Sequence, residues 1–149
     1  MTTTETAALN VLLIEDDPGD VLMVREVFED HGWASQLAVV GDGIDAVEYV
    51  RRAGAYAAVQ RPDLVLLDLN LPRMGGREVL QLLKADPDLG SIPVIVLTTS
   101  AAEEDIIRSY ANHANAYVTK PMDWAAFTDA IRGIGHFYAD VARLPARST

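Results

Sequence analysis

Seven polar side chains stand where apolar segments of the chain end, and their types suit one kind of chemistry. They are, in chain order, Glu15, Asp16, Asp17, Asp68, Thr98, Thr99 and Lys120. If the apolar segments are parallel strands of one sheet, the loops that follow them converge over one edge of that sheet. Carboxylates crowded into such a pocket repel one another, so the site must bind protons or recruit a cation. A divalent metal is the simpler solution.

The donor atoms in the chain decide which metal and which reaction this site suits. The chain has no Cys, and its three His residues lie far apart, so oxygen donors favour Mg2+, Mn2+ or Ca2+ over zinc or copper. Mg2+ typically takes one or two carboxylates and leaves its other positions to water and phosphate oxygens. A carboxylate can attack phosphorus while a metal, a Lys and a hydroxyl stabilise the charge on the transferred group. Asp68, alone at the end of its segment, is the candidate nucleophile.

The elements that must position these residues alternate between short apolar runs and segments of helical period. The predicted strands are Leu9–Ile14, Gln36–Val40, Asp63–Leu67, Pro93–Leu97 and Asn115–Val118. Helical segments lie between them and after the last, which is the (βα)5 pattern of a parallel sheet. Asp17 before Pro18 is better explained as a helix cap than as a metal ligand. Asp42 caps the second helix, and Ser100 begins the fourth with capping-box spacing.

Composition limits the classes of protein that fit. The 149 residues are 50% hydrophobic and 23% charged, which is typical of one globular domain. A net charge of −10 repels phosphate backbones and anionic lipids, so we expect neither nucleic-acid nor membrane binding. The absence of Cys and of a basic signal-peptide region favours a cytoplasmic protein. We expect a flexible tail over residues 1–8, a domain over 9–141 and a second tail over 142–149.

Four segments of the chain, in this order, resemble the receiver domains of two-component response regulators. They are IEDDP (14–18), DLVLLDLNLP with MGG (63–72 and 74–76), VLT (96–98) and AYVTKP (116–121). The resemblance covers Leu9 to about Phe137. It implies an α/β, flavodoxin-like (βα)5 fold, in which a doubly wound five-stranded parallel sheet has the strand order 2-1-3-4-5.

The resemblance also implies roles for the acidic residues at the strand ends. Asp68 would accept a phosphoryl group from a sensor histidine kinase. Glu15 and Asp16 match the acidic pair of the family. Together with Asp68 and the backbone carbonyl of Asn70 they would bind Mg2+, for which Mn2+ is a substitute. The protein would be a phosphoacceptor that assists its own phosphorylation and dephosphorylation rather than an enzyme.

Three more residues match the switch of the family. Lys120 would bind a phosphoryl oxygen, Thr98 would move toward the phosphoryl group, and Tyr117 would turn inward behind it. The family resemblance also implies a cis peptide bond before Pro121.

Two positions depart from the commonest pattern of the family. Thr99 stands where a small residue is usual, and Ser100 offers neither an acid nor an amide to orient a water. We expect these two residues to tune access to the phosphoryl group and its lifetime.

The last helical segment carries apolar residues at three- and four-residue spacing. They are Trp124, Phe127, Ile131, Ile134 and Tyr138. Core packing explains this seam, but further apolar residues lie off it, so a homodimer or partner surface is the alternative. Gly133 and Gly135 disfavour a helix interior and predict a break or kink. The end from Phe137 to Pro145 resembles the small receivers that accompany phytochrome-type histidine kinases.

Three functions are compatible with these residues. The first is a phosphorelay receiver whose output is a protein contact, because residues 122–149 are too few for a DNA-binding output domain. The second is a phosphatase with Asp68 as nucleophile, although Asn70 stands where such enzymes use an acid to protonate the leaving group. The third is a receiver fold used only as a constitutive interaction module, which the intact Asp68, Thr98 and Lys120 argue against.

Overall fold

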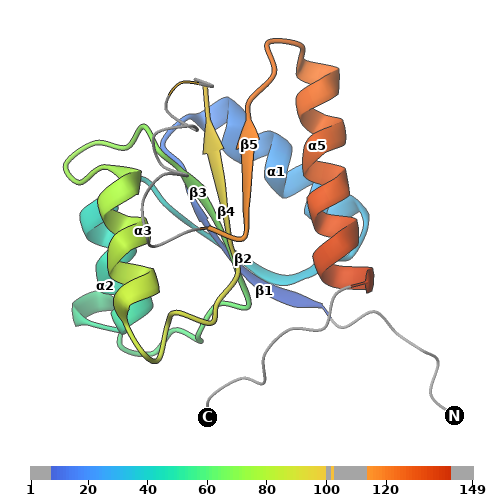
Figure 1. Ribbon diagram of the computed structural model, residues 1–149. Coiled ribbons are helices and arrows are strands. Elements are labelled where there is room, and N and C mark those ends of the chain that lie inside the picture. The colour runs from blue at the N-terminus through green and yellow to red at the C-terminus, as the bar shows by residue number, and fades with distance from the viewer. Residues whose placement is uncertain (1–7, 100–101, 103–113, 142–149) are drawn as a thin grey trace, which may run out of the picture.

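Five parallel strands form one sheet at the centre of the fold (Figure 1). The computed structural model describes residues 8–99, 102 and 114–141. The strands are β1 (Leu9–Ile14), β2 (Ala34–Val40), β3 (Leu64–Asp68), β4 (Val94–Thr98) and β5 (Ala116–Thr119). Their spatial order is β2-β1-β3-β4-β5, which confirms the predicted order. Each neighbouring pair runs parallel, so the strands all end at the same edge of the sheet.

Helices cover both faces of this sheet. The described helices are α1 (Pro18–Asp30), α2 (Gly43–Arg51), α3 (Gly76–Ala85) and α5 (Trp124–His136), with a 3₁₀ turn η1 (Gly54–Tyr56) and a π-helical turn η2 (Phe137–Val141). α1 and α5 lie on one face, and α2 and α3 lie on the other (Figure 1). The predicted fourth helix, with Ser100 at its start, falls outside the described residues except at position 102. In the described part of the chain, no helix is long and apolar enough to cross a membrane.

The three central strands are buried on both faces, which explains their unbroken apolar sequences. Every residue of β1, β3 and β4 is buried. Alternate residues of each strand pack toward opposite helical layers, because successive side chains of a strand point to opposite faces. β3 and β4 each end one residue later than predicted, at Asp68 and Thr98. The reason is that backbone pairing with the next strand continues through both residues.

Side-chain caps fix where the helices begin. The Asp17 carboxylate accepts two backbone N–H groups from the first turn of α1, which confirms its predicted role as a cap. Asp42 accepts the backbone N–H of Asp45 at the start of α2, which is also as predicted. Asp123 caps α5 in the same way. The cap at Asp17 places the first turn of α1 directly after the acidic end of β1.

Two apolar residues of α5 that were predicted to lie on a dimer or partner surface are buried instead. Phe127 and Ile131 are 3% and 0% exposed and belong to the core of the chain, not to a dimer surface. Ile134 and Tyr138 are half-buried against the same core cluster, whereas Trp124 is 53% exposed. The physical reason is that this side of α5 covers the sheet beside α1.

The predicted break at the two glycines of α5 is wrong. The helix runs through Gly133 and Gly135 and continues directly into η2. A Cβ atom on Gly135 would collide with the ring of Trp33, so this glycine allows α5 to approach closely. At Gly133 a Cβ atom would meet open space. Close packing at Gly135 thus compensates for the flexibility that glycine introduces into a helix.

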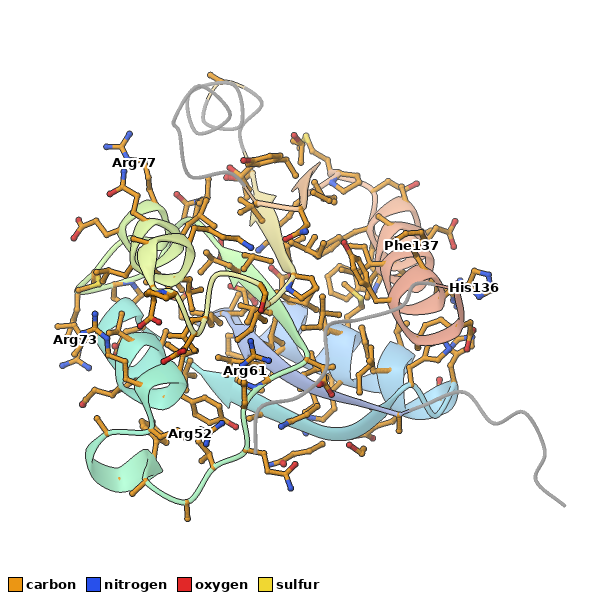
Figure 2. The ribbon with its side chains drawn as sticks, turned by 60° about the horizontal axis from the view of Figure 1, so that its bottom comes forward. Arg52, Arg61, Arg73, Arg77, His136 and Phe137 are labelled. Carbon is orange, nitrogen blue, oxygen red and sulfur yellow. The ribbon has the colours of Figure 1, made fainter. Side chains whose placement is uncertain are left out.

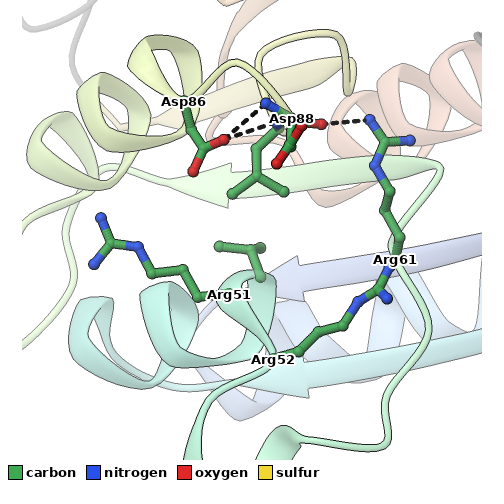
Figure 3. A pocket seen from close by; sticks show the side chains of 7 residues that line it. Arg51, Arg52, Arg61, Asp86 and Asp88 are labelled. Atoms are coloured by element: carbon green, nitrogen blue, oxygen red, sulfur yellow. Dashed lines mark hydrogen bonds between the residues drawn. The ribbon is translucent and has the colours of Figure 1, made fainter. Parts of the chain in front are cut away.

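A cavity of about 370 Å³ lies at the opposite edge of the sheet from the strand ends. It is lined by Val50, Arg51, Arg52, Arg61, Asp86, Asp88 and Leu89. Figure 2 labels two residues that line it, Arg52 and Arg61. Arg51 and Arg52 come from the end of α2, and Arg61 donates a hydrogen bond to the carbonyl oxygen of Asp88 in the turn that follows α3 (Figure 3). None of the residues that the sequence analysis selected lines this cavity, so the candidate site is elsewhere.

Candidate functional site

The carboxyl edge of the sheet brings three of the predicted acids together. One carboxylate oxygen from each of Glu15, Asp16 and Asp68 lies within 4.8 Å of the others. Glu15 and Asp16 follow β1, Asp68 ends β3, and these strands are neighbours in the sheet. Glu15 and Asp68 are buried while Asp16 is exposed. The acids therefore form a cluster that reaches solvent on the side of Asp16.

The loop after β3 holds Asp68 in place. The backbone N–H of Asn70 donates to Oδ1 of Asp68 at 3.1 Å. Gly76 lies so near that a Cβ atom there would be 2.5 Å from the Asp68 carbonyl oxygen. The side-chain amide of Asn70 donates to Oγ1 of Thr99 at 3.4 Å, and both residues are exposed. Thr99 is thus joined to the loop that carries Asn70, whereas Ser100 lies outside the described residues.

Lys120, which follows β5, contacts three carboxylates. Its Nζ lies 2.7 Å from Oε1 of Glu15, 2.7 Å from Oδ2 of Asp20 and 3.4 Å from Oδ2 of Asp68. Burial by itself lowers the pKa of the Lys120 ammonium, but its hydrogen bonds to Asp20 and Glu15 outweigh that effect and hold the pKa above its usual value. Lys120 therefore stays positively charged within a group of acids.

Glu15 is strongly perturbed by this environment. Its Oε2 accepts the backbone N–H groups of Asp16 and Asp17 at 3.1 and 3.3 Å, and its Oε1 accepts a hydrogen bond from Lys120. Burial raises the pKa of Glu15 to about 8, and a hydrogen bond with Asp68 adds to the rise against the opposing effect of Lys120. Without a cation, the crowded acids thus retain a proton near neutral pH.

Two of the three residues that match the switch of the family, Thr98 and Tyr117, lie on β4 and β5. Thr98 is fully buried, and its carbonyl oxygen accepts the backbone N–H of Lys120 at 2.6 Å. Tyr117 is half-buried, and its hydroxyl accepts the backbone N–H of Ala114 at 2.8 Å. The described residues contain no cis peptide bond, so the bond before Pro121 is trans, contrary to expectation. The trans form is the one that an X–Pro bond intrinsically prefers, by about 0.5–1 kcal/mol.

Asp20 also belongs to the site, although it is not among the residues predicted from the sequence. Its side chain is 15% exposed and contacts Lys120 from the first turn of α1. An acid in a first turn is favoured by the helix dipole, so its presence already has a local explanation. The spacing in the sequence could have indicated Asp20, because it follows Asp16 and Asp17 within about one helical turn.

The described residues fit a divalent cation that prefers oxygen ligands. Three carboxylates converge, and the chain has no Cys to offer a softer ligand. Such a donor set suits Mg2+ or Mn2+. The ammonium of Lys120 stands beside these acids and can attract an anionic oxygen. The arrangement can therefore hold a cation and an anionic group next to each other over the buried Asp68 carboxylate.

Comparison with known proteins gives a consistent result for sequence and structure. The family model of the response regulator receiver domain matches residues 11–132. The chain is 42% identical over 136 residues to the response regulator Rcp1 of Synechocystis sp., and the match covers 91% of this chain and 92% of that protein.

Two solved structures share the fold along almost their whole length. The phosphorylated cyanobacterial phytochrome response regulator RcpA superposes with a TM-score of 0.88 at 41% identity, covering 94% of this chain and 100% of that chain. The Mn2+-bound form of Rcp1 superposes with a TM-score of 0.85 at 40% identity, covering 93% of this chain and 99% of that chain.

Proposed function

This chain belongs to the response regulator receiver domain family, and from this membership we propose that Asp68 accepts a phosphoryl group from a sensor histidine kinase. As a response regulator it is a signalling protein. The observation that carries the proposal is the convergence of Asp68, the acidic pair and Lys120 at one edge of the sheet.

In the proposed reaction, an oxygen of Asp68 attacks the phosphorus of a phosphohistidine. A phosphorus–oxygen bond forms while the phosphorus–nitrogen bond breaks, and the imidazole nitrogen leaves with the electron pair. The backbone N–H of Asn70 orients Oδ1 of Asp68, and Oδ2 faces Lys120 at 3.4 Å. Lys120 would stabilise negative charge on the transferred oxygens as the new bond forms.

A divalent cation would share this site. Glu15, Asp16 and Asp68 would hold Mg2+ together with the backbone carbonyl of Asn70, and Mn2+ would substitute for it. When bound, the cation offsets the repulsion between the carboxylates and the phosphoryl oxygens. The proposal is supported by the three converging acids and by the relative Rcp1, for which a Mn2+-bound form is known.

A conformational change caused by phosphorylation would be transmitted to the surface of the molecule through β4 and β5. Thr98 would move toward the phosphoryl group and Tyr117 would turn inward behind it. The backbone hydrogen bond between Lys120 and Thr98, and the pairing of Tyr117 with the neighbouring strand, support this coupling. Thr99, which is joined to the loop after β3, would tune access to Asp68.

We infer that the kinase partner is of the phytochrome type and that the output is a protein contact. The support for the kinase class is the similarity to the cyanobacterial phytochrome response regulator RcpA. A second copy of the chain or another protein would bind the outer side of α5 and η2, where Trp124 and Phe137 are 53% and 49% exposed. Phe127 and Ile131 take no part in this surface, because they are buried in the core.

Intact-mass measurement after incubation with Mg2+ and a small acyl phosphate tests the proposed function. We expect the native chain to gain one phosphoryl group, and we expect no gain for Asp68→Asn or with excess chelator. A folded native chain that gains nothing, under conditions that label another receiver domain, would refute the proposal. Continuous release of phosphate from phosphomonoesters would instead favour the phosphatase.

A further inference from the structure

The ammonium of Lys120 lies closer to two flanking carboxylates than to Asp68. Its Nζ is 2.7 Å from both Glu15 and Asp20, but 3.4 Å from Asp68. The side chains of Lys120 and Asp20 are only 9% and 15% exposed, so water screens their attraction weakly. The contact joins the first turn of α1 to the end of β5 across 100 residues of sequence. The contact between Asp20 and Lys120 therefore forms only when the chain is folded.

Asp20 is separate from the three acids that converge as candidate metal ligands. Its backbone N–H donates to the side chain of Asp17, the cap of α1, at 3.3 Å. The start of α1 is thus fixed by a side-chain cap, and Asp20 has a defined position from which it attracts the ammonium toward α1. Glu15 and Asp20 together offset the attraction that Asp68 exerts on the same ammonium.

We propose that Asp20 is a positioning residue that holds Lys120 off the Asp68 carboxylate in the unphosphorylated chain. An ammonium and a divalent cation repel each other, so they compete for the oxygens of Asp68. With Asp20 present, Lys120 is drawn toward α1 and keeps only its longer, 3.4 Å contact with Asp68, which leaves the Asp68 oxygens more available to the cation. Without Asp20, the ammonium would settle on Asp68 and Glu15. This role deepens the proposed function of the same site and rests on it.

Calorimetric titration of the full chain with Mg2+ tests the positioning role. The variant is Asp20→Ala, and the matched control is Asp17→Asn, which removes one charge from the same turn and keeps a good helix cap. Among the described residues, no ammonium contacts the side chain of Asp17, which accepts backbone N–H groups. We expect Asp20→Ala to weaken Mg2+ binding by roughly three- to tenfold, and Asp17→Asn to weaken it by less than about twofold.

Asp20→Ala and Asp17→Asn are then each made in a Lys120→Met chain. This comparison shows whether Asp20 acts on Mg2+ affinity by positioning Lys120 or only through its own negative charge. Without the ammonium, Asp20→Ala should affect Mg2+ affinity no more than Asp17→Asn does. Equal losses for Asp20→Ala with and without Lys120 would overturn the positioning role. So would equal losses for Asp20→Ala and Asp17→Asn in the native background. Thermal unfolding checks that each variant folds, and Asp20→Asn replaces Asp20→Ala if the alanine variant does not.

Mg2+ affinity is measured without any phosphoryl transfer, so the two proposals can fail separately. Normal labelling of Asp68 without coupling between Asp20 and Lys120 overturns the positioning role alone. Coupling without labelling of Asp68 overturns the proposed function alone. A folded chain that binds no Mg2+ overturns both.

Discussion

At the scale of single residues, the charged groups of the site act together rather than as separate pairs. Glu15, Asp20 and Asp68 share the one ammonium of Lys120, and Glu15 also accepts two backbone N–H groups. Groups that share partners in this way do not respond to substitution independently. The effect of changing one acid should therefore depend on which of the others is present and on whether a cation is bound.

The first prediction at this scale concerns Glu15 and pH. The pKa of Glu15 rises from 4.5 to about 8 in the folded chain, so the folded state binds this proton more tightly than the unfolded chain does. Its contribution to stability is present in full below pH 4.5 and is lost as the pH rises through 8. Urea unfolding in a chelator should show a loss of at most about 5 kcal/mol over this range. Glu15→Gln should flatten the profile, and an unchanged profile in that variant would contradict the assignment.

At the scale of elements, local chemistry could be predicted better than contacts between distant segments. The caps at Asp17 and Asp42 were predictable because each bonds to the first turn of its own helix. The strand order followed from a resemblance carried by motifs at the strand ends. Helical period placed Phe127 on an apolar face of α5, but period alone does not say whether that face meets the sheet or another chain.

The same difference applies to the candidate site: some of its contacts could be predicted from the sequence and others could not. Glu15, Asp16 and Asp68 could be grouped from the sequence, because the ends of parallel strands converge whatever the details of the loops. The contact between Asp20 and Lys120 could not, because it depends on the direction in which α1 leaves β1 and on side chains 100 residues apart.

Two glycines in α5 provide a matched test of how this helix packs. Gly135→Ala would drive a Cβ atom into the ring of Trp33, while Gly133→Ala would place one in open space. We expect the first change to destabilise the chain by about 1–3 kcal/mol through overpacking. We expect the second to stabilise it by about 0.5–1 kcal/mol through helix propensity. Urea unfolding measures both, and changes of the same sign and size would show that α5 does not approach Trp33 closely.

The loop between β3 and α3 offers a second matched pair. Gly76→Ala would place a Cβ atom 2.5 Å from the Asp68 carbonyl oxygen, whereas Gly75→Ala would meet nothing within 4 Å. Backbone cannot yield as a flexible side chain can, so Gly76→Ala should cost about 1–3 kcal/mol of stability. It should also slow phosphorylation by displacing Asp68 or Asn70. Denaturant unfolding and intact-mass labelling would test this, and a Gly76→Ala chain that labels like Gly75→Ala would argue against close control of Asp68 by this loop.

At the scale of the whole molecule, only the folded chain brings the acids of β1 and β3 together. A cation that binds the folded state and not the unfolded state must stabilise the fold. Thermal unfolding should therefore shift upward with Mg2+, with a gain of about 2.7 kcal/mol when Mg2+ is at a hundred times its dissociation constant. Asp68→Asn should remove much of this gain. A melting temperature that does not depend on Mg2+ would be evidence against the metal site.

The central claim is that Asp68 is the residue that forms an acyl phosphate, and locating the phosphoryl group tests it most directly. Borohydride reduces an aspartyl phosphate to homoserine, whose position can be read by tandem mass spectrometry after digestion. Following treatment with a small acyl phosphate and Mg2+, we predict homoserine at position 68 alone, and none when a chelator is present. Homoserine at Asp16 or at another carboxylate, with Asp68 unmodified, would contradict the claim.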